Sequence, residues 1–199
     1  MRKPDLFAPL IAALDRPSAE SSDFDLNPGV TLPEGRVLRP AGVLVPVIER
    51  AGALRVILTK RASHLKHHPG QIAFPGGKVD EGDAGVVAAA LREADEEIGL
   101  SPQNVEVLGF LPSHETVTGF SMTPVLGRIR AEFTPIPEPG EVEEVFSVPL
   151  SHVTNLARFT IESRRWRGQR RQYFTVPYGP YYIWGATARV LRGLADRMT

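Results

Sequence analysis

Three glutamates on one predicted helix are the residues whose types and spacing most clearly suggest chemistry. Residues 91–100 have the sequence LREADEEIGL, in which Glu96 and Glu97 follow Glu93 by three and four positions. That spacing makes helical side chains neighbours, and neighbouring carboxylates repel one another unless a cation lies between them. Their hard oxygen atoms suit Mg²⁺ or Mn²⁺. The alternative interpretation is a solvated acidic helix face without a ligand.

The opposite face of this helix is apolar, which predicts packing against a sheet. Its periodic positions are Val87, Leu91, Ala94 and Ile98. We expect the helix to span residues 84–98, with Asp83 as its N-cap. Arg92 is expected to pair with Glu96 four residues later, which by itself is an ordinary surface contact.

Two adjacent glycines precede the helix, in the segment Phe74-Pro75-Gly76-Gly77. Glycines adopt backbone conformations closed to other residues and let a ligand or metal approach a bare carbonyl. Such a turn is common and indicates little alone. Its fixed distance from the acidic helix makes the combination specific.

The segment from Gly77 to Leu100 resembles the Nudix signature, G-x5-E-x7-R-E-U-x-E-E-x-G-U, where U is a bulky aliphatic residue. The match covers the last nine positions from Arg92 onward, except that Ala94 is small where U is expected. The loop before Arg92 has one residue more than the signature, and Asp83 stands where its first glutamate belongs. This longer spacing with an aspartate is the usual form in the coenzyme A pyrophosphatase branch of the family.

A second resemblance to that branch lies directly upstream. The branch has approximately L-L-T-x-T-[S/A]-x3-R-x3-G-x3-F-P-G-G, and residues 57–77 follow this spacing. Two positions differ, because Arg61 replaces a threonine and Lys66 replaces an arginine. Lys66 keeps the positive charge but lacks the planar fork that binds phosphate through two hydrogen bonds. With further matches at 141–150 and 183–188, the resemblance extends over about residues 36–195.

The resemblance implies a metal-dependent diphosphatase and assigns roles to single residues. The implied metal ligands are Glu93, Glu97, Glu96 and the carbonyl of Gly76 or Gly77. Arg92 would orient these carboxylates by salt bridge. The general base is expected to be Glu93 or Glu96, or else a residue of a later loop or strand end. The candidates there are Glu115, Glu141, Glu143 and Glu144.

The coenzyme A branch implies cleavage of the coenzyme A diphosphate to 4′-phosphopantetheine and adenosine 3′,5′-bisphosphate. The implied substrate-binding residues are Arg61, Lys66, Phe74 and Gly76, while His67 and His68 either bind phosphate or are solvated. Three alternatives stay open: a Nudix hydrolase of ADP-ribose or a dinucleotide, a non-catalytic regulatory domain that binds nucleotides, and an RNA pyrophosphohydrolase. The three intact glutamates argue against the second alternative, and the lack of net positive charge argues against the third.

Five arginines between residues 164 and 171 form a basic segment close to Trp166 and Tyr173. Basic and aromatic side chains together can stack a base and bind a phosphate. A solvated turn at the tip of a hairpin is the other interpretation, and the one that the sequence favours. We interpret four nearby aromatic residues as core or dimer contacts: Tyr178, Tyr181, Tyr182 and Trp184.

The composition is that of a globular protein without charge bias. The 199 residues include 23 basic and 23 acidic side chains and no cysteine. Thus no global field attracts nucleic acid or an anionic membrane, and disulfides and thiolate metal sites are excluded. No segment has the length of a membrane span. We expect a cytoplasmic protein that binds a small coenzyme A-type nucleotide, with no nucleic acid or membrane partner, and a homodimer as an option.

The pattern of apolar runs predicts an α/β architecture, and the resemblance implies the Nudix fold, a mixed β-sheet sandwiched between helices (α/β/α). Strands are expected at 42–49, 54–59, 71–74, 105–111, 124–130 and 142–148, with a hairpin of 159–166 and 172–176. A closing helix is expected at 183–197. An amphipathic helix within residues 1–16 and a linker should form an N-terminal region, 1–35, that packs on a Nudix domain of residues 36–199.

Overall fold

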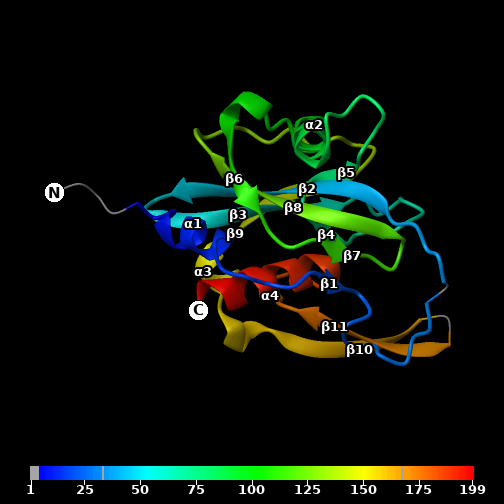
Figure 1. The fold of residues 1–199 in the computed structure, drawn as a ribbon. Coiled ribbons are helices and arrows are strands. Elements are labelled where there is room, and N and C mark those ends of the chain that lie inside the picture. The colour runs from blue at the N-terminus through cyan, green and yellow to red at the C-terminus, as the bar shows by residue number, and fades with distance from the viewer. Residues whose placement is uncertain (1–4, 33, 167) are drawn as a thin grey trace.

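The computed structural model describes residues 5–32, 34–166 and 168–199, with the side chain of Trp166 left out. Residues 1–4 of the predicted N-terminal helix therefore lie outside the described residues. A single large sheet lies between two helical layers (Figure 1). The helices are α1 (Ala8–Leu14), α2 (Val86–Ile98), α3 (Leu150–Val153) and α4 (Ala186–Met198). Because α2 covers one face and the other three lie on the opposite face, the predicted α/β/α arrangement is confirmed.

The sheet is built around two long parallel neighbours, β2 (Arg39–Arg50) and β8 (Phe120–Ile129). The other strands are β1 (Ser21–Ser22), β3 (Ala53–Arg61), β4 (Ile72–Ala73), β5 (Gly76–Lys78), β6 (Val105–Phe110), β7 (His114–Glu115) and β9 (Val142–Pro149). β3 forms the predicted antiparallel hairpin with β2, and β9 pairs antiparallel with β3. Parallel and antiparallel pairs therefore coexist, as the expected mixed sheet requires.

Strand β2 supports both helical layers because its side chains alternate between the faces. Leu44 and Ile48 pack in the core cluster beneath α2, whereas Val45 packs in the cluster beneath α4. The beginning of α2 lies so close to β2 that a β-carbon on Gly42 would collide with the carbonyl of Val86. This contact fixes the start of α2 above the centre of the sheet.

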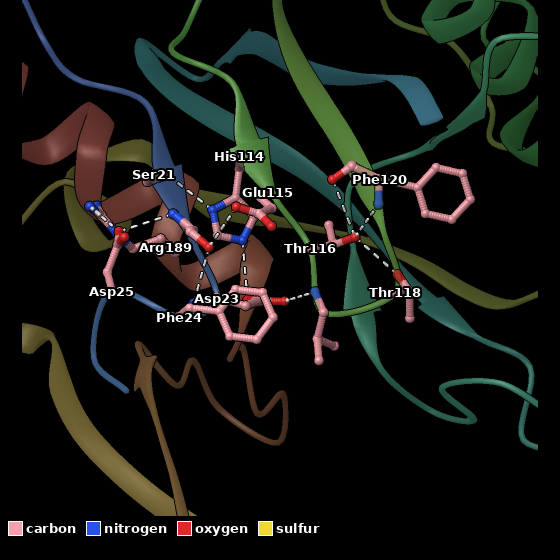
Figure 2. A network of polar contacts seen from close by, with 12 residues as sticks. Ser21, Asp23, Phe24, Asp25, His114, Glu115, Thr116, Thr118, Phe120 and Arg189 are labelled. Atoms are coloured by element: carbon pink, nitrogen blue, oxygen red, sulfur yellow. Dashed lines mark hydrogen bonds and ion pairs between the residues drawn. The ribbon is translucent and has the colours of Figure 1, made fainter. Parts of the chain in front are cut away.

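A buried histidine fastens the N-terminal segment to the sheet edge (Figure 2). His114 is 0% exposed, with Nδ1 3.0 Å from Ser21 Oγ and Nε2 3.1 Å from Asp23 Oδ1. Asp23 also accepts a hydrogen bond from the Val117 N–H (2.8 Å), and β1 pairs in parallel with β7. Buried polar groups are costly when they lose their partners, so these bonds hold the segment in place. The region expected to be a linker thus contributes a strand.

The predicted C-terminal hairpin forms a separate two-stranded sheet of β10 (Thr160–Trp166) and β11 (Gln169–Thr175). It lies beyond α4, on the side of the molecule away from α2 (Figure 1). Short 3-10 turns, η1 (Pro102–Asn104) and η2 (Leu156–Arg158), precede β6 and β10. Over the ranges that the structure describes, no helix is long and apolar enough to span a membrane.

Candidate active site

The glycine pair and the acidic helix meet through contacts between backbone and carboxylates. The Gly76 N–H donates a hydrogen bond to Glu97 Oε2 at 3.2 Å. At the next residue, the Glu93 carboxylate lies against the α-carbon of Gly77, where a β-carbon would be 2.6 Å from Glu93 Cδ. Only glycine leaves room for the carboxylate at this point. The two glycines therefore fix the positions of two of the three glutamates.

Burial changes the acidity of both glutamates. Glu97 is 5% exposed, and burial raises its pKa to about 8, with the Gly76 hydrogen bond opposing the shift and the charge of Glu93 adding to it. Burial also raises the pKa of Glu93, against the influence of Arg92. A buried carboxylate beside a half-buried one is costly unless a cation compensates them. Their oxygen atoms are the donors that Mg²⁺ or Mn²⁺ prefers, so the pair fits a divalent metal.

Arg92 lies at the centre of an acidic network anchored by Asp83. Its Nε and Nη2 donate to the two carboxylate oxygens of Asp83, each at 3.0 Å. Its Nη1 donates to Glu93 at 3.1 Å and to Glu96 at 2.9 Å. The Arg92 guanidinium lowers the pKa of Asp83, and Asp83 in turn raises the pKa of Arg92. Arg92 therefore holds two helix carboxylates in place from a fixed position.

The prediction that Asp83 is the N-cap of α2 was wrong. Gly85 occupies the cap with φ 124°, and no side chain caps the helix. The Asp83 carboxylate is engaged by Arg92 instead. The sequence did contain a signal for this role, because Asp83 stands six residues after Gly77, where the Nudix signature has its first glutamate.

Glu96 differs from the other two glutamates in its exposure. Its side chain is 60% exposed, against 15% for that of Glu93. Among the described residues, no three acidic or histidine side chains are grouped closely enough to hold a metal ion as they stand. Glu93 and Glu97 are thus the pair that fits a metal, while Glu96 contacts Arg92.

Strand pairing brings two residues from distant segments to the glutamate pair. The Ala62 N–H donates to the Glu141 carbonyl at 2.8 Å, next to the end of β3 at Arg61. The charge of Arg61 lowers the pKa of Glu97, whereas the charge of Glu141 raises it. Glu141 also raises the pKa of Glu93. Glu141 therefore lies near both carboxylates, and Arg61 lies near that of Glu97.

The other three loop or strand-end candidates for a general base have partners of their own. Glu143 pairs with Lys60, Glu144 accepts a hydrogen bond from Tyr181, and Glu115 pairs with Arg36. The ring of Tyr181 stacks on Phe146, with centroids 3.6 Å apart, in the cluster that faces α4. Glu144 thus lies on the face of the sheet opposite to α2 and the glutamate pair.

The expected substrate-binding residues are divided between surface and core. Lys66 is exposed in the loop between β3 and β4, and Arg61 is half-buried at the start of that loop. Phe74, in contrast, is 5% exposed and packs in the cluster that faces α4. Phe74 therefore supports the turn into β5 and offers no surface to a ligand. Gly76 contacts the site through its N–H group, which donates its hydrogen bond to the Glu97 carboxylate.

Comparison with known proteins identifies the fold that carries this site. The family model of the NUDIX domain matches residues 38–167. This chain belongs to the Nudix family. Nudix hydrolases act on derivatives of nucleoside diphosphates and generally use divalent metals such as Mg²⁺ or Mn²⁺. Family membership thus supports an enzyme that acts on phosphorus anhydrides.

Relatives and solved structures agree with this family. The Nudix hydrolase NudL of Enterobacter sp. (strain 638), itself uncharacterized, is 45% identical over 157 residues, which are 79% of this chain and 81% of that protein. The NUDIX domain of Shewanella oneidensis NrtR, solved with ADP ribose, is 16% identical with a TM-score of 0.52 and covers 87% of this chain and 93% of its own. The Nudix hydrolase RenU of M. smegmatis is 22% identical with a TM-score of 0.50, over 62% of this chain and 84% of its own. These two structures show the Nudix fold alone.

Proposed function

We propose that this Nudix hydrolase cleaves the diphosphate bond of coenzyme A or its derivatives. The products would be 4′-phosphopantetheine, or its acyl form, and adenosine 3′,5′-bisphosphate. The observation that carries the proposal is the action of the Arg61 charge on Glu97, whose pKa it lowers. Arg61 lies within the segment that resembles the coenzyme A branch, where it replaces the threonine of that pattern, and its positive charge supplies a cationic partner that a substrate diphosphate beside the glutamates would need.

Glu93 and Glu97 are the proposed metal ligands, with Glu96 and the Gly77 carbonyl as further donors. A divalent cation bound there would neutralise the diphosphate charge and activate a water molecule. The chain itself supplies the arrangement of the donors. Gly77 leaves space for Glu93, Gly76 donates a hydrogen bond to Glu97, and the Asp83-anchored Arg92 keeps Glu93 and Glu96 oriented.

A general base must take a proton from the attacking water at a carboxylate close to the metal donors. We propose that Glu93, Glu96 or Glu141 does so. Glu141 is supported by its exposure and by its electrostatic effect on both Glu93 and Glu97. The contact between Glu144 and Tyr181 on the other face of the sheet removes Glu144 from this set.

The alternative substrates share the diphosphate group and differ in what flanks it. The NrtR domain was solved with ADP ribose, so the same fold accommodates that ligand in another protein. A non-catalytic nucleotide-binding domain would have no need of two adjacent carboxylates supported by two glycines. The segment upstream of the glycines favours coenzyme A over ADP-ribose because it follows the branch pattern as far as Phe74, although Arg61 and Lys66 depart from that pattern.

The test is a substrate panel with the purified protein in Mg²⁺ or Mn²⁺. Coenzyme A, ADP-ribose, NADH and a capped RNA are incubated separately, and the products are identified by mass spectrometry. We expect coenzyme A to give adenosine 3′,5′-bisphosphate, and the Glu97→Gln variant to give no product. Turnover of ADP-ribose far above that of coenzyme A would reject the proposed substrate. Full activity of Glu97→Gln would reject the metal site.

A further inference from the structure

An arginine of the C-terminal hairpin is stacked on an aromatic surface outside the metal site. Arg164, on β10, has its guanidinium carbon 4.2 Å from the centre of the Trp184 ring. The Tyr173 ring lies 5.0 Å from the same indole, and its hydroxyl is 3.4 Å from that of Tyr182. Tyr182 is 46% exposed. Such a set combines a planar cation, which binds phosphate, with rings on which a nucleobase stacks.

The loop between β3 and β4 brings more positive charge to this surface. A β-carbon on Gly185 would be 3.6 Å from Gln71 Nε2, so the end of the loop abuts the residue that follows Trp184. The Thr187 hydroxyl also donates to the Ile72 carbonyl at 3.0 Å. Loop and aromatic surface are therefore packed side by side.

His68, within this loop, connects the hairpin with the metal site. Loss of hydration lowers its pKa, and the charges of Arg61, His67 and Arg164 lower it further, opposed by that of Asp23. The Arg61 N–H donates to the Gln71 carbonyl at 2.9 Å, and the Gln71 N–H donates to the His68 carbonyl at 3.2 Å, so the backbone holds Arg61 near His68. The charge of Arg164 acts on His68 as well. Because Arg61 also acts on Glu97, positive groups extend from the glutamate pair towards Trp184.

The hairpin itself holds like charges directly opposite one another. Arg164 is the cross-strand neighbour of Arg171, and Arg165 is that of Arg170. Like charges in such positions destabilise a sheet. Two carboxylates act on this surface: the charge of Asp23 acts on His68, and that of Glu162 acts on Tyr182, whose pKa is raised mainly by burial. An anion bound at Arg164 would offset the repulsion through charge-assisted hydrogen bonds.

We propose that Arg164, His68 and the rings of Tyr173, Tyr182 and Trp184 form a subsite for the phosphorylated adenosine end of the substrate. The adenine stacks on the tyrosine rings, the 3′-phosphate binds at Arg164 and His68, and Arg61 lies between this subsite and the metal donors. The inference rests on the proposed function, because it takes this end of coenzyme A as the ligand. It assigns to the hairpin the selection of a nucleotide that carries a second phosphate. Arg167 and the side chain of Trp166 lie outside the described residues and are not part of it.

The experiment measures equilibrium binding without requiring turnover. The full-length protein is titrated calorimetrically with adenosine 3′,5′-bisphosphate and with 5′-AMP, which lacks the second phosphate. We expect the bisphosphate to bind more tightly to the wild type. Arg164→Gln should weaken its binding about tenfold, the effect of losing a charge-assisted hydrogen bond, while leaving 5′-AMP almost unchanged.

Two matched variants on the same hairpin control for charge. Arg165 neighbours Arg164 but points to the other face of the strand, so Arg165→Gln should leave both affinities unchanged. Arg170 lines a hollow of about 440 Å³ with Asn27 and Gln172, which is the competing location for the nucleotide. A loss in Arg165→Gln or Arg170→Gln equal to that in Arg164→Gln would overturn the subsite, as would equal binding of the two nucleotides by the wild type.

The same titrations separate the subsite from the proposed function. If the wild type fails to hydrolyse coenzyme A but binds the bisphosphate through Arg164, the proposed reaction is wrong and the subsite stands. If coenzyme A is hydrolysed and Arg164→Gln leaves both bisphosphate affinity and the KM for coenzyme A unchanged, the reaction stands and the subsite is wrong. Melting temperatures of the variants verify that each one is folded.

Discussion

The carboxylate of Glu93 occupies the space that a side chain would need at Gly77. A β-carbon on Gly77 would be 2.6 Å from Glu93 Cδ, nearer still to Glu93 Oε1, and 3.0 Å from Oε2. Gly77 does not adopt a positive φ, so its backbone does not require glycine. The requirement for glycine comes from the Glu93 carboxylate, and it therefore links Gly77 to the proposed metal site and not to the turn.

Gly77→Ala should therefore damage the site while preserving the fold. The added methyl group displaces Glu93, and a shift of about 1 Å in such a group lowers kcat/KM by roughly 100-fold. Steady-state kinetics and circular dichroism measure the two effects. Gly82→Ala is the matched control, because its β-carbon meets nothing within 4 Å and its φ is not positive either. Equal activity of the two variants would contradict the role of Gly77.

Because Arg92 and Asp83 form one bidentate contact, substitution of either residue should lower activity by a similar factor. Arg92→Lys keeps the charge but not the fork, and Asp83→Asn removes the acid that positions it, so each should lower kcat by about 10–100-fold. Because both changes break one interaction, the double variant should be little worse than either single variant. Asp80→Asn is the control, since Asp80 is 3.5 Å from Arg92 and exposed. Additive losses would show that the two residues act separately.

The raised pKa of Glu97 makes the metal-free protein sensitive to alkaline pH. Its pKa is about 8 in the folded chain against an ordinary value of 4.5, so ionisation favours the unfolded state. The stabilising effect of the protonated carboxyl is complete below pH 4.5 and is lost as pH rises to about 8. Glu97→Gln keeps a hydrogen-bond acceptor for the Gly76 N–H and cannot ionise. The stability of this variant should therefore not fall over that pH range.

Thermal melting in the presence of a chelator tests whether the stability of the wild type falls as pH rises. At pH 5 the wild type and Glu97→Gln should melt at similar temperatures, whereas at pH 9 the variant should be more stable by more than about 1 kcal/mol, or roughly 2–4 °C. Addition of Mg²⁺ at pH 9 should raise the melting temperature of the wild type but not that of the variant. If the melting temperatures of the wild type and of Glu97→Gln depend on pH in the same way, the raised pKa of Glu97 in the metal-free protein is wrong.

Local patterns in the sequence predicted the elements that carry this site. The helical repeat from Val87 to Ile98 identified α2, and β-branched runs identified β2 and β3, because burial on a fixed face demands that periodicity. The two-residue strands β1 and β7 escaped prediction, since a segment so short becomes a strand only through its partner. For β1 that partner is β7, held by His114 over more than ninety residues of chain.

Long-range strand pairing also explains why the proximity of some site residues could not be predicted from the sequence. Glu93 and Glu97 share a helix face, so their proximity follows from helix geometry alone. Glu141 reaches them only because β9 pairs with β3, a register that no local pattern encodes. The same pairing turns Glu144 to the opposite face, although it lies three residues from Glu141. From the sequence, these two glutamates were equivalent candidates.

Substitutions of Glu141 and Glu144 should differ in their effect on catalysis, because the two carboxylates lie on opposite faces of the sheet. If Glu141 is the general base, Glu141→Gln should lower kcat by about 10²–10⁴-fold with little effect on KM and should remove the acidic limb of the pH–rate profile. Glu144→Gln should leave kcat nearly unchanged, because its carboxylate contacts Tyr181 on the far side of the sheet. Glu96→Gln tests the candidate base on helix α2 in the same assay. Retention of kcat in Glu141→Gln, together with its loss in Glu96→Gln, would place the base on α2.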